Sequence, residues 1–283
     1  MKETRAEYLP VEKLRPFEGH PFKVVDNEEM DQLVWSILTQ GLLTPLVVRP
    51  LANGEYEVIS GHRRLHACKK AGIETVPALV YAIDRDAAAI ALVDSNLHRE
   101  RILPSEKAFA YKLKMDALKR QGQRTDLTSG QVGPKLRTDE EIAQDADDSA
   151  RQVKRYIRLT NLIPSILEKV DDGRIALTPA VELSYLTEAE QKDLLETMES
   201  EDCTPSLSQA IQLKQLSQAG KLDMDTIFGI LTQPKANQRE KISFRTDEVR
   251  KFFPRNYTPA QMQEVILKLL GEYQRKRQRS QER

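Results

Sequence analysis

The segment from Glu57 to Leu65 constrains the fold of this 283-residue chain more than any other segment. It joins a short run of strand-forming residues to Gly61 and then to a helix that opens with two arginines. Gly61 predicts a tight turn, because a residue without Cβ tolerates positive φ and close approach of a ligand. The free N–H groups of the new helix favour an anion, and Arg63 and Arg64 carry guanidinium groups that match phosphate oxygens. The segment therefore predicts a phosphate-binding turn between a strand and a helix.

A second polar run, residues 94–100, follows an Ala-rich apolar helix expected at 87–93. It places Asn96 and Arg99 three positions apart, on one face of a helix. An amide oxygen can ligate a hard cation, and an arginine can bind a triphosphate. Taken alone, the turn at Gly61 is also compatible with a surface junction whose two arginines are simply solvated. The two runs together favour a nucleotide site.

Residues 1–100 alternate short apolar runs with amphipathic segments, which predicts a small α/β domain. We expect helices at 27–40 and 62–71, ended by Gly41 and Gly72. Strands are expected at 46–48, 56–60 and 76–81, and residues 22–25 are expected to be extended. The first helix should bury its apolar side, which consists of Met30, Leu33, Val34, Ile37 and Leu38.

Residues 101–233 read as an all-α domain that contains a helix-turn-helix at 138–160. A helix is expected from Pro104 to Arg120, followed by a polar loop at 121–130. Thr138 with Glu141 forms a capping box, and Ser149 with Gln152 forms a second one. The two short helices should bury Ile142, Ala143 and Ala146 from the first and Val153 and Ile157 from the second. Helices joined by a tight turn in this way are typical of a helix-turn-helix.

The second helix of this pair should expose a basic, amide-bearing face. Arginine and glutamine can bind guanine and adenine edges bidentately, whereas lysine contacts phosphate. An ordinary solvated face is the alternative, but no acidic residue occurs between Ser149 and Leu167. The predicted DNA-binding residues are Ser149, Arg151, Gln152, Lys154, Arg155 and Arg158.

Residues 234–283 are expected to form a small C-terminal unit, reached through a linker at 233–238. Thr258-Pro259 predicts a helix start. Its apolar stripe, which suits either a dimer contact or an intramolecular core, consists of Met262, Val265, Ile266, Leu269, Leu270 and Tyr273. The basic tail at 275–279 either contacts the DNA backbone or is a solvated end.

The charges of the chain balance to a formal net charge of zero, but they are unevenly distributed. Residues 101–170 and 234–283 are basic, whereas residues 1–100 and 171–233 are acidic. Two separate basic blocks are expected if particular faces meet nucleic acid. The two cysteines, Cys68 and Cys203, have no metal-like spacing and indicate a reducing compartment. No apolar signal region or membrane-spanning run is evident, so we expect a cytoplasmic protein without a membrane partner.

The chain resembles the ParB partition-protein family over nearly its whole length. Residues 14–16, 21–23 and 42–50 are similar to the family's opening segment. Gly61 to Arg64 resembles its Gly-Glu-Arg-Arg box, Ser95 to Arg99 its Glu-Asn-x-x-Arg box, and Leu103 to Ala108 the Leu-x-Pro-x-Glu-x-Ala run that follows. The resemblance implies a ParB/sulfiredoxin-like N-terminal domain that binds CTP with Mg²⁺ in a nucleotide-gated DNA clamp. The nucleotide-binding residues it implies are Gly61, His62, Arg63, Arg64, Asn96 and Arg99, with Asn96 as a metal ligand.

Two positions depart from the family's boxes. His62 stands where the family usually has Glu, and Ser95 stands where it usually has a carboxylate. The loss of an acid beside Asn96 removes a natural magnesium ligand and a group that could position a water. We therefore expect CTP binding with slow or absent hydrolysis, and the sequence identifies no catalytic residue.

The leading hypothesis is a homodimeric, sequence-specific DNA-binding partition protein. It would act as a CTP-gated sliding clamp at a centromere-like inverted repeat of double-stranded DNA, with a Walker-type ATPase as partner. A nucleoid-occlusion protein or a transcription regulator of a mobile element is an alternative. A ParB-like nuclease is disfavoured, since no Asp/Glu cluster accompanies the phosphate-binding runs. Sulfiredoxin chemistry is also disfavoured, because Gly61 stands where that reaction needs a cysteine.

Overall fold

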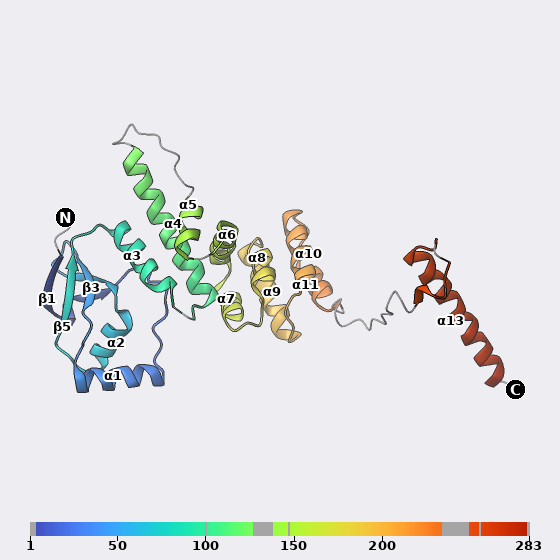
Figure 1. Cartoon of the computed structure of the whole chain (residues 1–283), viewed down its shortest axis with the longest axis horizontal. Helices are drawn as coiled ribbons and strands as arrows, with labels where there is room; N and C mark the ends of the chain where they lie inside the picture. Colours follow the sequence, from blue (N-terminus) through green and yellow to red (C-terminus); the bar gives the residue numbers. More distant parts are fainter. Residues whose placement is uncertain are drawn as a thin grey trace. The chain divides into compact units, whose positions relative to one another are not determined.

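The computed structural model describes residues 4–99, 101–126, 138–146, 148–233, 249–254 and 256–281. The chain forms two compact units, residues 1–233 and 234–283 (Figure 1). The expected linker, apart from its first residue, and the second half of the expected polar loop lie outside the described residues. No helix among the described residues is long and apolar enough to cross a membrane.

A five-stranded mixed sheet forms the start of the first unit, in the order β1-β5-β3-β4-β2. Its strands are β1 (Thr4–Pro10), β2 (Leu14–Pro16), β3 (Leu46–Pro50), β4 (Tyr56–Ser60) and β5 (Thr75–Tyr81). β1 pairs with β5, and β3 with β4, in antiparallel fashion. β2 runs parallel to β4, and β3 runs parallel to β5. Pairing with both β3 and β2 makes β4 an internal strand of the sheet, and Gly61 follows its last residue.

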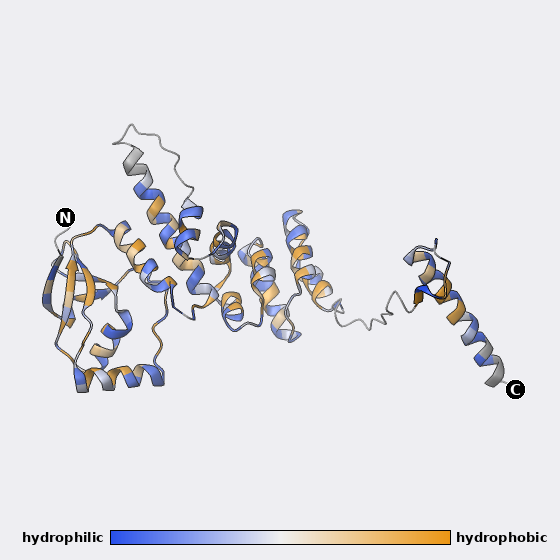
Figure 2. Cartoon of the chain, viewed as in Figure 1, coloured by the Kyte–Doolittle hydropathy of each residue, from blue (hydrophilic) through white to orange (hydrophobic). Residues whose placement is uncertain are grey.

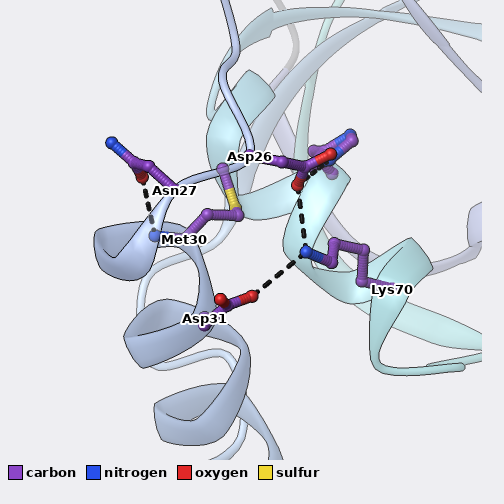
Figure 3. Close-up of polar contacts among 6 residues, drawn as sticks. Asp26, Asn27, Met30, Asp31 and Lys70 are labelled. Atoms are coloured by element: carbon purple, nitrogen blue, oxygen red, sulfur yellow. Dashed lines mark hydrogen bonds and ion pairs between the residues drawn. The ribbon is translucent and has the colours of Figure 1, made fainter.

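Helices α1 (Glu28–Gln40) and α2 (His62–Lys70) cover one face of the sheet. Asn27 caps α1 by accepting a hydrogen bond from the backbone N–H of Met30 (Figure 3). The Lys70 ammonium at the end of α2 lies 3.0 Å from the carboxylate of Asp26 and 3.2 Å from that of Asp31. These contacts fix the start of α1 against α2. The two helices can therefore form one side of a site above the turn at Gly61.

Helices α3 (Arg85–Leu97) and α4 (Pro104–Asp126) pack together, and their small and branched residues bury Ile59 of β4, Phe17 and Phe22. Seven further α-helices follow among the described residues of the first unit. They are α5 (Thr138–Ala146), α6 (Ala150–Arg158), α7 (Pro164–Asp171), α8 (Leu177–Leu183), α9 (Glu188–Ser200), α10 (Leu207–Gln218) and α11 (Met224–Leu231). Short 3₁₀ segments lie at Val11–Lys13 and Leu159–Asn161.

Two hydrophobic clusters hold helices α5 to α11 together and against α4. Tyr111 of α4 packs with Ile142, Ala143 and Val153, and so holds α5 and α6 against the middle of α4. A larger cluster extends from α7 to α11. In Figure 2, apolar and polar colours alternate along these helices, as expected when one face of each is buried.

The predicted α/β class of the N-terminal part is confirmed, whereas several local expectations need correction. Strands β1 and β2 were not expected. The helix predicted to end at Arg120 continues to Asp126. Thr138 is the first residue of α5 rather than the residue before it. Leu38, predicted to be buried in α1, is 58% exposed.

The second unit is built around α13 (Pro259–Gln281). Thr258 and Gln261 cap its start through reciprocal hydrogen bonds, as the sequence pattern at Thr258-Pro259 predicted. Met262 is buried and Val265 and Ile266 are half-buried, so the first half of the apolar stripe is covered within this unit. Leu269, Leu270 and Tyr273 stay more than half exposed. The stripe therefore divides into an internal half and an exposed half.

Candidate nucleotide pocket and nucleic-acid interface

Gly61 makes the turn from β4 to α2 with φ 104° and ψ 25°, in the left-handed region. A Cβ at this position would lie 2.6 Å from Cδ2 of Leu46 on the neighbouring strand β3. Any other residue would thus be both strained and in collision with the sheet. No described side chain caps the N-terminus of α2. The predicted tight turn between strand and helix is present, and no side-chain hydrogen bond satisfies the first N–H groups of α2.

Two arginines from the first turn of α2 are held in different ways. Arg64 donates from Nη1 to the backbone carbonyls of Thr44 (2.5 Å) and Pro45 (3.0 Å), at the start of β3. Burial lowers the pKa of Arg64, although an arginine stays charged at neutral pH. Arg63 is more exposed and lies 3.1 Å from the Glu29 carboxylate of α1. Arg64 therefore supports the loop that faces the turn, while Arg63 is held by a single exposed pair.

Arg99 follows the end of α3 and lies with its guanidinium carbon 5.4 Å from the centre of the Phe22 ring. Burial lowers the pKa of Arg99 most, the carboxylate of Glu106 raises it, and the positive charge of Arg63 lowers it. Both guanidinium-bearing residues line one cavity, Arg63 from α2 and Arg99 from the segment after α3. A cluster of cations partly removed from water favours a multiply charged anion.

Asn96 is only 4% exposed and its amide is oriented by its own helix. Its Nδ2 donates to the carbonyl of Leu92 at 2.7 Å and to Oγ of Ser95 at 3.2 Å. The Ser95 hydroxyl donates in turn to the same Leu92 carbonyl. Because the amide nitrogen is engaged in these bonds, Oδ1 is the atom left to bind a cation or a sugar hydroxyl.

His62 is buried and, unlike the two arginines that follow it, is uncharged. Its Nε2 accepts a hydrogen bond from the backbone N–H of Phe17 at 3.3 Å, and its ring lies 3.7 Å from that of His20. Burial lowers the pKa of His62 to about 3 and that of His20 to about 4. Both rings are neutral at physiological pH. His62 therefore anchors the Phe17 segment and adds no positive charge for a phosphate.

One cavity of about 530 Å³ is lined by all six predicted nucleotide-binding residues. Gly61, His62, Arg63 and Arg64 come from the β4–α2 junction, and Asn96 and Arg99 from the end of α3. Sequence reasoning missed four further lining residues, Ser60 and, from α1, Glu29, Gln32 and Leu33. Positions 29, 32 and 33 share one face of a helix, so the spacing alone could have marked them as neighbours.

The predicted metal site has few protein ligands. No group of three or more His, Cys, Asp or Glu side chains suited to a metal ion occurs among the residues that the structure describes. Magnesium bound to a nucleotide needs only one or two protein oxygens, since phosphates and water fill its remaining positions. The oxygen of Asn96 and the carboxylate of Glu29 both line the cavity and fit that limited role.

Helix α6 begins as predicted, because the Ser149 hydroxyl accepts a hydrogen bond from the backbone N–H of Gln152 at 3.1 Å. Arg151 is exposed near the start of the helix. Lys154 is exposed as well, and its ammonium lies 2.8 Å from the Asp139 carboxylate of α5. These side chains have the surface positions expected of a helix that contacts DNA.

The arginines in the second half of α6 bind within the protein. Arg155 donates to Oε1 of Gln152 and, at 2.7 Å, to the hydroxyl of Thr178 on α8. Arg158 donates to the side chain and carbonyl of Ser184 and lies 3.9 Å from the centre of the Tyr185 ring. The predicted exposure of Arg155 and Arg158 is wrong, because both are half-buried, and the Arg158 guanidinium packs α6 against the end of α8.

Known proteins that are similar to this chain are named for chromosome partitioning and for nucleoid occlusion. The family model described as ParB N-terminal domain matches residues 1–97. A probable chromosome-partitioning protein ParB from Pseudomonas putida is 32% identical over 188 residues, which cover 66% of this chain and 59% of that protein. A nucleoid occlusion protein from Listeria innocua is 32% identical over 193 residues, covering 68% of this chain and 62% of that protein. The chain thus spans about three fifths of the length of the curated relatives it matches.

Among solved structures, one match is the C-terminally truncated chromosome-partitioning protein ParB from Caulobacter crescentus, complexed to the centromeric parS site. It is 24% identical and has a TM-score of 0.43. The match covers 74% of this chain and 98% of that chain.

Proposed function

We propose that this chain, which belongs to the ParB family, is a CTP-binding partition protein that recognises a centromere-like DNA site. In this proposal CTP gates a dimeric clamp, which loads at an inverted repeat and then slides along double-stranded DNA. The observation that carries the proposal is the cavity in which both motif runs meet. The relatives named for chromosome partitioning support the same biological role.

The cavity suits a nucleoside triphosphate for electrostatic and steric reasons. Gly61 and the uncapped start of α2 offer backbone N–H groups, and Arg63 of α2 and Arg99, just after α3, add guanidinium groups. Phosphates gain most from such convergent donors where water is partly excluded. The preference for CTP over other nucleotides rests on the resemblance of the two boxes to those of the family.

Magnesium is the proposed second component, with Oδ1 of Asn96 as its protein ligand. When bound, the cation would neutralise part of the charge of the phosphates. Asn96 is well placed for this role, since its two helix-directed hydrogen bonds fix the direction of the amide. The neighbouring Ser95 hydroxyl donates to Leu92 and is a poor base, so we propose that CTP turnover is slow or absent.

Helices α5 and α6 are the proposed helix-turn-helix, with α6 in the major groove. The first residues of such a helix contact base edges, which gives Arg151 and Gln152 the leading recognition role, with Arg155, one turn after Arg151, beside them. Ser149 and Lys154 are proposed to contact phosphate. Arg158 is proposed to act on DNA indirectly, because its contacts with Ser184 and Tyr185 fix the orientation of α6.

The remaining partners are proposed from symmetry and from the family resemblance. An inverted-repeat site requires a two-fold protein, and Leu269, Leu270 and Tyr273 are exposed apolar residues that could form the homodimer contact. The basic tail that follows them would add contacts with DNA backbone. A Walker-type ATPase is the proposed motor partner, and the protein would act at the nucleoid in the cytoplasm.

A second role at the same site is nucleoid occlusion, which the name of the Listeria innocua relative favours. Regulation of transcription on a mobile element would use the same DNA-binding helices. A nuclease lacks support from the cavity, whose described lining includes a single carboxylate, Glu29. Sulfiredoxin chemistry lacks its nucleophile, because Cys68 is buried in α2 and burial raises its pKa.

Titration calorimetry of the full chain with each of the four ribonucleoside triphosphates and Mg²⁺ tests the pocket. We expect CTP to bind more tightly than the others, and Arg63→Ala to weaken CTP binding by about tenfold or more, since hydrogen bonds to charged groups contribute about 1.5–3 kcal/mol. Arg85→Ala is the matched control, because Arg85 is also an exposed arginine paired with a glutamate, Glu18. Equal weak binding of all four nucleotides, or identical behaviour of the two variants, would contradict the assignment.

Selection of a DNA site from a random library, followed by binding measurements, tests the recognition helix. The triple variant Arg151→Ala, Gln152→Ala and Arg155→Ala should lose specific binding and keep part of its non-specific binding. Unchanged affinity for the selected site would remove α6 from this role.

Sedimentation of a truncated chain that ends at Gln233 tests the dimer contact. That truncation removes the whole second unit. We expect the full chain to be dimeric and the truncated chain to be monomeric at micromolar concentration without nucleotide. A truncated chain that remained dimeric would place the contact in the first unit.

A further inference from the structure

Lys114 is the most completely buried charged side chain described in the first unit, at 1% exposure. It comes from the middle of α4, and its Nζ lies 2.5 Å from Oδ1 of Asp94 and 2.6 Å from Oδ2 of Asp145. Burial alone would lower the pKa of Lys114, but the hydrogen bonds to Asp145 and Asp94 outweigh it and raise the pKa. The lysine is therefore a fixed cation held between two carboxylates.

The two carboxylates belong to the two proposed binding regions. Asp94 lies on α3 immediately before Ser95 and Asn96, which line the nucleotide cavity. Asp145 lies near the end of α5, the first helix of the proposed helix-turn-helix. Lys114 thus connects, through a single ammonium group, the helix that carries the nucleotide box with the helix that precedes the recognition helix.

Because the Lys114 ammonium is buried, it cannot easily give up its two carboxylate partners. Asp94 and Asp145 are 41% and 51% exposed at their side chains, so either can be rehydrated if it separates from the lysine. The ammonium cannot, because an unpaired charge in this position would lose most of its solvation. A displacement of the end of α3 relative to α5 therefore has to be accommodated at Lys114, by moving α5 as well or by breaking one of the two pairs.

Apolar side chains also connect α3, α4 and α5. Leu97, one turn after Asp94 on α3, packs both against the cluster that covers the sheet and against the cluster of Tyr111, Ile142 and Val153. Tyr111 lies one turn before Lys114 on α4, and its hydroxyl donates to the Asp148 carboxylate in the turn before α6. Polar and apolar contacts between α3, α4 and α5 thus meet around one lysine.

We propose that Lys114 is a positioning residue that couples occupancy of the nucleotide cavity to the placement of the DNA-binding helices, through its simultaneous pairs with Asp94 and Asp145. The inference rests on the proposed function, because it needs both ligands. It adds the residue through which one site acts on the other. Coupling of this kind is reciprocal, so it is measured as the factor by which DNA changes CTP affinity and CTP changes DNA affinity.

The test compares that factor in the full chain and in three variants. Lys114→Met keeps the length and apolar stem of the side chain and releases to water both aspartates, whose side chains are already 41% and 51% exposed. Asp145→Asn removes only the pair with α5 and leaves Asp94 in place. Arg120→Gln is the matched control, because Arg120 of α4 pairs with Asp86 of α3 at 2.8 Å, joining the same two helices without reaching α5.

Titrations with CTP and Mg²⁺, with and without a saturating selected DNA duplex, give the factor. In the unsubstituted chain we expect a change of about 5- to 150-fold. It should fall to within twofold of unity in Lys114→Met and decrease in Asp145→Asn, while CTP affinity without DNA and the melting temperature of Asp145→Asn change little. Arg120→Gln should keep the factor of the unsubstituted chain.

The outcomes separate the two proposals. If the unsubstituted chain binds neither CTP nor a selected duplex, the proposed function fails and the coupling role falls with it. If it binds both and the factor is already unity, or the factor survives in Lys114→Met and Asp145→Asn, only the coupling role is overturned. An equal fall in Arg120→Gln would also overturn it, since the effect would then come from general loosening of α3 and α4.

Discussion

The arginines around the cavity and the arginines of α6 differ in what surrounds them. Arg63 comes from α2 and Arg99 from the segment after α3, and both line one cavity, where partial burial lowers the pKa of Arg99. On α6, by contrast, Arg155 and Arg158 bind side chains and a carbonyl of α8 and the residue after it. Cationic side chains that line one cavity from different segments are therefore a better indication of a binding role than a basic helix face is. A basic helix face can serve the packing of its own domain as well as a ligand.

The largest expected effect is that of Gly61→Ala, which changes the turn that lines the cavity. Left-handed strain together with the clash against Leu46 should lower stability by about 3 kcal/mol. We expect CTP binding to become undetectable in calorimetry. Gly54→Ala is the control, because Gly54 also has positive φ (+80°) but a Cβ there would meet nothing within 4 Å. Similar losses in both variants would mean that strain alone, without the close approach, explains the effect.

Arg158→Ala should reveal the packing role of the second half of α6. The loss of its contacts with Ser184 and Tyr185 should lower the free energy of unfolding by about 2 kcal/mol, seen as a lower melting temperature. Arg151→Ala, on the exposed start of α6, should change stability by less than about 0.5 kcal/mol and weaken specific DNA binding instead. An unstable Arg151→Ala together with a stable Arg158→Ala would reverse our distinction between the two halves of the helix.

Acidification should act on the N-terminal part through His20 and His62, near Arg99. Their folded pKa values, about 4 and about 3, lie below the ordinary value of 6.5. The unfolded chain therefore takes up protons first, and stability present above pH 6.5 is lost as the pH falls towards 4. For His62 the loss at pH 5 should be roughly 2 kcal/mol. Chemical unfolding between pH 7 and pH 5 measures it, and His62→Gln should flatten the dependence; an unchanged slope would contradict the neutral state of this ring.

The smallest expected effect is that of Lys154→Ala. Lys154 is exposed, but its partner Asp139 is buried, so some loss of stability should accompany the loss of this cation. If it contacts phosphate, its loss should weaken binding to all sequences by about 1 kcal/mol or less and lower the salt dependence by about one unit of slope. Binding at several salt concentrations, to the selected site and to random DNA, makes this measurement. A loss confined to the selected site would instead assign Lys154 to base recognition.

The sequence predicted those parts of the site that depend on local geometry. Gly61 and the arginines after it occupy one turn, so their arrangement follows from φ and helix spacing alone. Glu29 and Gln32 were missed because their approach depends on how α1 docks onto α2, which is set by the distant pairs of Lys70 with Asp26 and Asp31.

Burial was harder to predict than secondary structure. Leu38 has the spacing of a core residue yet is exposed, and Arg158 has the composition of a surface residue yet is half-buried. Strand β1 was missed because its polar, proline-ended sequence reads as irregular, although β5 supplies it with a full partner. Each error concerns a tertiary contact that no local pattern specifies.

The bond between Phe17 and His62 has a consequence for the order in which the molecule assembles. It joins residues 45 positions apart and ties the residue after β2 to the first residue of α2. Closing so long a loop is slow, and its entropy is lost before the contact is gained. The cavity should therefore be completed late in folding, after the central strands have paired. A bound nucleotide would act chiefly on the reverse step, prolonging the lifetime of the native N-terminal part against unfolding and proteolysis.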